Sequence, residues 1–133
     1  MLKSNPKLCK LKQQDRLYQM PVPIIGLTGG IASGKSSVSA LLRKSGIQII
    51  DADQLVKSIY LKNEVIQSIG LIAPKAVDRS QIDFKILREL FFSDPNIQSQ
   101  VEKLIYAQMP LAFEQAFETK IKDKQDFIIY DVP

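Results

Sequence analysis

The chain has 133 residues, 45% of them apolar, and its 18 Lys and Arg outnumber its 14 Asp and Glu to give a net charge of +4. This length and apolar content suffice for a buried core, so wholesale disorder is excluded. The chain has no histidine and one cysteine, Cys9, which excludes histidine acid–base catalysis, Cys/His zinc sites and an internal disulfide.

The positive charge is concentrated at the N-terminus. Residues 1–23 carry five basic side chains and one acidic side chain: Lys3, Lys7, Lys10, Lys12, Arg16 and Asp15. Residues 24–133 therefore have equal numbers of each sign. We expect 1–23 to be a basic, poorly ordered leader, with a polyanion-binding arm or a targeting presequence as alternatives. We expect no nucleic-acid partner for residues 24–133.

The first half of the remaining chain alternates between strands and helices. An apolar run over residues 24–28 predicts a buried strand. A helix is predicted over residues 35–44, with Val38, Leu41 and Leu42 on its apolar face, and Ser45-Gly46 ends it. Residues 47–50 predict a second strand. Further helices are predicted from near residue 54 and over residues 64–69, followed by a loop over 70–80.

The second half continues this alternation. Residues 82–92 predict a helix, and a long helical stretch follows over residues 97–122. Pro110 is expected to kink or split that stretch, because its ring clashes with the preceding turn. Residues 127–131 predict a third strand. Together these elements predict an α/β fold with a parallel sheet covered on both faces.

The most specific motif lies between the first strand and the first helix, where residues 29–36 satisfy the pattern G-x-x-x-x-G-K-[ST]. Such a loop turns its backbone N–H groups onto phosphate oxygens, and the following helix adds its free amides. We expect Lys35 to reach the β- and γ-phosphates of ATP, and Ser36 to bind Mg²⁺. The predicted phosphate-binding residues are Gly29, Gly30, Ile31, Ala32, Ser33, Gly34, Lys35, Ser36 and Ser37.

Three carboxylates follow predicted strands, at the edge of a parallel sheet where ligands bind. Asp53 can accept a proton from an attacking hydroxyl, or it can simply cap the helix that follows. Asp51 can be an outer ligand of Mg²⁺. Asp131 closes an apolar strand, as in a Walker B motif, and is expected to orient metal-bound water; a plain polar strand end is the alternative.

With these residues in view, the chain resembles the dephospho-CoA kinase family. The match covers residues 26–36 (GLTGGIASGKS) and residues 46–53 (GIQIIDAD). Residues 82–95 and 127–133 resemble the family's F-x-D-P helix end and the strand leading to D-V-P-L-L-F-E. The resemblance implies a P-loop nucleoside triphosphate hydrolase fold and Mg²⁺-dependent transfer of the ATP γ-phosphate to dephospho-CoA, the last step of coenzyme A synthesis. It also implies that Asp53 is the general base and Lys35 a catalytic residue. We expect a cytoplasmic protein, because a single cysteine fits a reducing compartment, and no membrane partner, because no apolar run approaches the roughly 18 residues that a span needs.

Two departures from the family pattern are visible. Tyr106-Ala107 stand where the family has His-Pro. The family also continues beyond Pro133 with an Arg-bearing lid and further strands, so we expect 24–133 to be the N-terminal two-thirds of a kinase core, incomplete at its C-terminus. The strand over 24–28 is then an exposed edge. Another P-loop nucleoside or nucleotide kinase, or a nucleotide-binding product without turnover, is the alternative.

Overall fold

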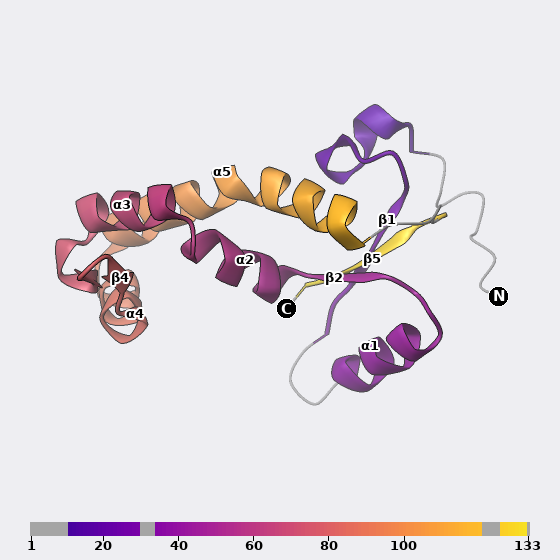
Figure 1. Cartoon of the computed structure of the whole chain (residues 1–133), viewed down its shortest axis with the longest axis horizontal. Coiled ribbons are helices and arrows are strands. Elements are labelled where there is room, and N and C mark those ends of the chain that lie inside the picture. Colours follow the sequence, from indigo (N-terminus) through magenta and orange to yellow (C-terminus); the bar gives the residue numbers. More distant parts are fainter. Residues whose placement is uncertain (1–10, 30–33, 121–125, 133) are drawn as a thin grey trace. The chain divides into compact units, whose positions relative to one another are not determined.

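The structure, a computed structural model, describes residues 11–29, 34–120 and 126–132 (Figure 1). It divides into two compact units, the first made of residues 1–53 and 113–133 and the second of residues 54–112. Among the described residues, none of the helices is both long enough and apolar enough to cross a membrane.

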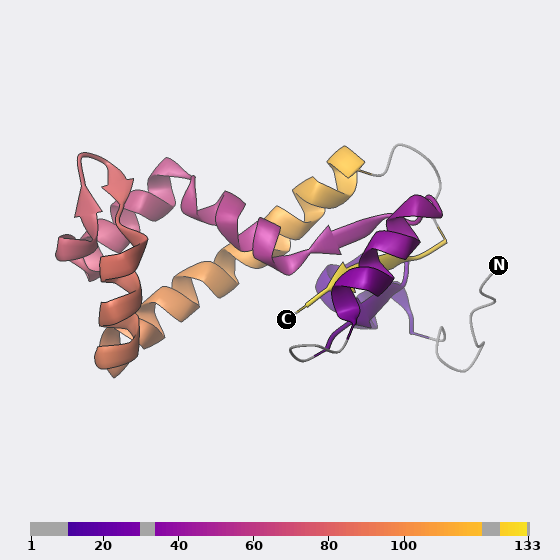
Figure 2. The ribbon, with the colours of Figure 1, turned by 90° about the horizontal axis from the view of Figure 1, so that it is seen from below.

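The first unit is built on a three-stranded sheet. Its strands are β1 (Ile24–Leu27), β5 (Ile128–Asp131) and β2 (Ile49–Asp51), in the order β1-β5-β2. Both pairings are parallel, as predicted, and β2 and β5 lie side by side in both views (Figure 1 and Figure 2). Because β5 is the central strand, all four of its residues are buried.

The expectation that the sheet is covered on both faces is wrong for β1. This strand pairs only with β5 among the described strands, so it forms the edge of the sheet. Its Ile25 side chain is 44% exposed, and an added Cβ at Gly26 would meet no atom within 4 Å. The exposed edge that we expected at this strand is confirmed.

The two faces of β5 meet different neighbours, because successive side chains of a strand point to opposite sides. On one side, Phe113 is fully buried and stacks on Tyr130, with 4.9 Å between the ring centroids. On the other side, Asp131 contacts helix α1 (Lys35–Lys44). Figure 1 shows α1 on one side of the sheet and the N-terminal 3₁₀ turns on the other.

Part of the expected leader is folded. Residues Gln13–Asp15 and Leu17–Gln19 form 3₁₀ turns, and Met20 is buried. The ring of Tyr18 lies 5.2 Å from that of Phe113, so these turns belong to the first unit. These turns are folded because aromatic rings pack there. The charge and the proline content of the segment, on which the prediction rested, do not reveal such packing. Residues 1–10 of the leader lie outside the described residues.

The second unit is mostly helical. Its elements are the rest of α2 (Ala52–Tyr60), α3 (Asn63–Ile72), η3 (Pro74–Ala76), β3 (Val77–Asp78), β4 (Gln81–Ile82), α4 (Phe84–Ser93) and the first part of α5 (Pro95–Lys120). Its core is a set of buried apolar side chains, one or more from almost every element: Ile59, Val65, Ile69, Ala76, Leu87, Val101 and Ile105.

The predicted loop over 70–80 is more ordered than we expected. Helix α3 continues to Ile72, and β3 and β4 form a small antiparallel hairpin. Arg79 and Ser80 turn the hairpin with positive φ angles of 49° and 62°. Neither residue is one of the usual turn formers with positive φ, so the sequence carried no strong turn signal there.

Of the kink or split predicted at Pro110, the split is wrong, because α5 continues through this residue. A proline inside a helix leaves the carbonyl four residues earlier without its N–H donor. That carbonyl belongs to Tyr106, an exposed residue. Met109 and Ala112, on either side of Pro110, are buried. Burial of these neighbours outweighs the lost hydrogen bond.

Candidate phosphate-binding site

The ends of the three parallel strands form a single line of residues. Leu27 of β1 and Asp51 of β2 are both in register with Asp131 of β5. The N–H of Val132 continues the line by donating to the carbonyl of Leu27, at 2.9 Å. The predicted phosphate loop begins two residues after Leu27, at Gly29. The site therefore forms at the carboxyl edge of the sheet, where ligands bind in parallel α/β proteins.

Gly34 joins the loop to α1. It has a φ of +81°, in the left-handed region, and stands at the N-cap of the helix. A Cβ there would meet nothing within 4 Å, so the glycine is required by its dihedral angles and not by space. Gly30, Ile31, Ala32 and Ser33, four of the predicted phosphate-binding residues, lie outside the described residues.

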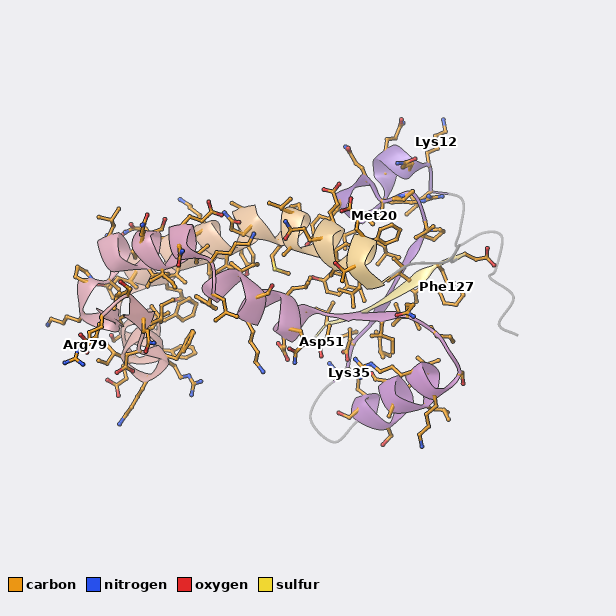
Figure 3. The ribbon with its side chains drawn as sticks, viewed as in Figure 1. Lys12, Met20, Lys35, Asp51, Arg79 and Phe127 are labelled. Carbon is orange, nitrogen blue, oxygen red and sulfur yellow. The ribbon has the colours of Figure 1, made fainter. Side chains whose placement is uncertain are left out.

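Lys35 and Asp131 form an ion pair across the site. The Lys35 Nζ lies 2.8 Å from Asp131 Oδ1 and also donates to the carbonyl of Val132, at 3.2 Å. The structure thus brings together the lysine expected on the phosphates and the carboxylate expected near the metal. Figure 3 shows Lys35 at the start of α1, where the sheet and this helix meet.

The same carboxylate has a second partner that we did not predict. The Ser39 hydroxyl donates to Asp131 Oδ2, at 3.2 Å, and Ser39 is 3% exposed. Ser39 is the buried residue of α1, whereas Val38 and Leu41 are 45% and 65% exposed. The predicted apolar face of this helix is therefore wrong. A serine four residues after the motif lysine was the only available signal, because positions i and i+4 share a helix face.

Asp51 and Asp53 have different roles at the end of β2. Asp51 Oδ1 accepts the backbone N–H of Asp53, at 2.8 Å, so Asp51 rather than Asp53 caps the start of α2. Asp53 is exposed in the first turn of that helix, and no partner of its carboxylate is found among the described residues. Asp53 thus presents a carboxylate at the strand edge; Figure 3 marks Asp51 at the end of β2.

Ser36 and Ser37 occupy the exposed first turn of α1. The described residues contain no cluster of three or more Asp, Glu, Cys or His side chains that could hold a metal. Mg²⁺, however, usually binds one or two carboxylates plus phosphate oxygens and keeps several waters. A serine hydroxyl and the Asp131 carboxylate are suitable hard oxygen donors for such a site.

Tyr130 anchors the strand that carries Asp131. Burial raises the pKa of the Tyr130 phenol, and the charge and hydrogen bond of Tyr18 raise it further. The phenol therefore stays neutral, packed against Phe113. This aromatic packing fixes the end of β5 from the face opposite to α1.

The second unit contains one further feature that we did not predict. A pocket of about 200 Å³ is lined by the side chains of Tyr60, Phe84, Leu87, Arg88 and Phe91. The rings of Tyr60 and Phe84 meet edge to face, with 5.3 Å between their centroids. Burial raises the pKa of Tyr60. The pocket comes from α2 and α4, which the sequence places 24 or more residues apart.

A strand, then a glycine-rich sequence motif, then a helix whose first residue is Lys35, with an aspartate on the neighbouring parallel strand, is the arrangement typical of P-loop proteins. The family model for dephospho-CoA kinase matches residues 23–133. The chain belongs to the dephospho-CoA kinase family. The family resemblance and the P-loop type of α/β fold predicted from the sequence are thus confirmed.

Comparison with individual proteins supports the same family assignment. The chain is 40% identical over 116 residues to a dephospho-CoA kinase of Fusobacterium nucleatum, covering 86% of this chain and 58% of the relative. It is 32% identical over 111 residues to one of Gluconobacter oxydans, covering 83% and 55%. A crystal structure of a Thermus thermophilus protein superposes with a TM-score of 0.73 at 29% identity, covering 85% of this chain and 56% of that one. The matched part of the chain thus spans a little over half the length of these relatives.

Proposed function

We propose that this protein transfers the γ-phosphoryl group of ATP to the ribose 3′-hydroxyl of dephospho-CoA, yielding coenzyme A and ADP. The observation that supports this function is the arrangement at the strand ends. The motif lysine, Lys35, is paired with Asp131 of the central strand, and Asp53 presents a carboxylate beside the neighbouring strand. The proposal includes a cytoplasmic reaction, because a single cysteine fits a reducing compartment.

In this mechanism, the backbone amides of the loop and of α1 bind the phosphate oxygens. Lys35 leaves Asp131 and neutralises the charge of the β- and γ-phosphates. The 3′-oxygen attacks the γ-phosphorus, the bond to the β–γ bridging oxygen breaks, and Asp53 accepts the hydroxyl proton. Catalysis consists of positioning and charge neutralisation, without a covalent intermediate.

Mg²⁺ is part of the proposal. Ser36 would hold the ion directly, and Asp131 would hold it through water, since both supply hard oxygen donors. When bound, the ion neutralises charge on the phosphates. Asp51 is less suited to this role, because its Oδ1 accepts the N–H of Asp53.

The decisive experiment is to incubate the whole chain with ATP, Mg²⁺ and dephospho-CoA, and to measure coenzyme A. Asp53→Asn should lower kcat by about a hundredfold or more, because a general base contributes about 10²–10⁴. Its affinity for ATP should stay unchanged. Asp78→Asn, which alters an exposed aspartate of the β3–β4 hairpin, is the matched control and should retain full activity.

Three other outcomes would contradict parts of the proposal. Wild-type turnover by Asp53→Asn would remove Asp53 as the base. A higher kcat/KM with nucleosides or nucleoside monophosphates than with dephospho-CoA would favour another small-molecule kinase. Binding of ATP without phosphorylation of any acceptor would favour a nucleotide-binding product without turnover.

A further inference from the structure

The orientation of helix α1 is set by a polar contact. A helix with apolar residues at helical spacing normally buries them, yet here Leu41 is 65% exposed and Ser39 is buried. A buried hydroxyl needs a hydrogen-bond partner, and Ser39 finds it in Asp131 Oδ2. Lys35, one turn earlier on the same face, contacts the other oxygen of the same carboxylate. One face of α1 thus holds Asp131 with an ion pair and a hydrogen bond.

The two partners of Asp131 differ in what happens to them when nucleotide binds. Under the proposed function, the Lys35 ammonium moves to the phosphates and leaves Asp131 Oδ1. Asp131 is a buried carboxylate, and a buried charge without a partner is costly. Ser39 is the partner that stays, because its hydroxyl is fixed by burial and does not take part in phosphate binding.

We propose that Ser39 is a positioning residue for nucleotide binding: its hydroxyl holds the Asp131 carboxylate in place when Lys35 departs to the phosphates. This inference rests on the proposed function. Without the hydroxyl, departure of Lys35 leaves Asp131 without either of its described partners, so Lys35 remains with Asp131 and the nucleotide binds more weakly. The hydroxyl also keeps the carboxylate from rotating to follow the ammonium.

The test is the affinity of the whole chain for ATP, measured by calorimetry with EDTA present, so that no divalent cation takes the place of the Lys35 charge. Ser39→Ala should weaken binding about three- to tenfold. The upper value corresponds to about 1.4 kcal/mol, close to the contribution of a hydrogen bond to a charged group. Alanine favours helices, so the variant should still fold.

Two further variants separate positioning from a general loss of stability. Ser39→Thr keeps the hydroxyl and should restore most of the affinity. Ser45→Ala is the matched control, because Ser45 follows the last residue of α1 as its C-cap and its hydroxyl donates to the carbonyl of Leu41, at 3.1 Å, and not to Asp131. Thermal unfolding of the same samples records stability. Ser45→Ala should leave the affinity for ATP unchanged, whatever its effect on stability.

Each contrary result would overturn a different part of the proposal. Equal affinities of wild type and Ser39→Ala would overturn the positioning role while leaving the proposed function intact. An equal loss in Ser39→Ala and Ser39→Thr would also overturn it, because the loss would then come from packing and not from the hydroxyl. A wild-type chain that binds ATP with Mg²⁺ but not with EDTA would overturn this inference alone, because the Lys35 charge would then not support binding by itself. A wild-type chain that binds no ATP in either buffer would overturn the proposed function together with this inference.

Discussion

The ion pair between Lys35 and Asp131 should stabilise the first unit measurably. The Lys35 side chain is 21% exposed and that of Asp131 12% exposed, so the pair is neither on the surface nor fully buried. Exposed pairs contribute about 0–1 kcal/mol, and removing one partner of a buried pair costs about 3–5 kcal/mol. We therefore expect Asp131→Ala to cost about 2 kcal/mol, because it leaves the Lys35 ammonium and the Ser39 hydroxyl without this partner.

A double-mutant cycle isolates the pair from other effects. Combining Asp131→Ala with Lys35→Met should give a coupling free energy of about 1–2 kcal/mol. Combining it with Lys57→Met, which removes an exposed lysine of α2, should give additive costs. Because the chain has two compact units, amide hydrogen exchange of β5 is the preferred assay, since it reports on the first unit alone.

Two results would contradict a stabilising role of the Lys35–Asp131 ion pair. A coupling free energy below about 0.5 kcal/mol would be within ordinary additivity and would show that the pair contributes no stability. An Asp131→Ala variant with wild-type exchange rates in β5 would show that replacing Asp131 does not lower the stability of the first unit. Either result would also contradict the inference that Asp131 is left as an unpaired buried charge, unfavourable in free energy, when Lys35 departs.

Four other predictions follow from local geometry. Gly34→Ala should cost about 1–2 kcal/mol in thermal unfolding, because its φ of +81° strains any residue with a Cβ; an unchanged melting temperature would contradict this. Phe113→Ala should cost about 3–5 kcal/mol in urea unfolding, since its fully buried ring stacks on Tyr130, and a loss below about 1 kcal/mol would show that the site collapses around the gap. Asp83→Ala should cost about 0.5–2 kcal/mol by the same assay, because Asp83 Oδ1 accepts two N–H groups at the start of α4; a neutral effect would show that water replaces the cap. Burial raises the pKa of Tyr60 above 10.0, so the folded state keeps a proton that the unfolded state releases, and stability should fall as pH rises above about 10. The fall in the urea midpoint should be smaller in Tyr60→Phe, and equal falls in both proteins would contradict this cause.

The local elements were largely predictable because their signals are local. Helix α1 has the predicted bounds, since Gly34 precedes it and Ser45-Gly46 ends it. The three strands of the sheet lie within one or two residues of their predicted positions, because short apolar runs between polar segments mark buried strands. The phosphate-loop motif was equally visible, since its chemistry depends on adjacent residues.

Features that depend on distant contacts were not predictable. The edge position of β1 follows from the strand order, in which β5, the last of the described strands, lies between β1 and β2. Helix α5 continues through Pro110 because Met109 and Ala112 are buried. Their burial offsets the free energy lost with the hydrogen bond that proline cannot donate. Capping by Asp51 instead of Asp53 depends on where β2 ends, and element ends are the least certain part of any sequence prediction.

Amino-acid order alone specifies which chemical groups are present and how they follow one another: a glycine-rich motif, a lysine at a helix start, and aspartates at strand ends. Which of these groups meet depends on how the helices and strands pack. Ser39 and Asp131 are 92 residues apart in the chain, and Lys35 is 97 residues from the carbonyl of Val132. The physical reason is that the face a helix buries is chosen by its partners, and here a carboxylate on the central strand outweighs the apolar side chains of α1.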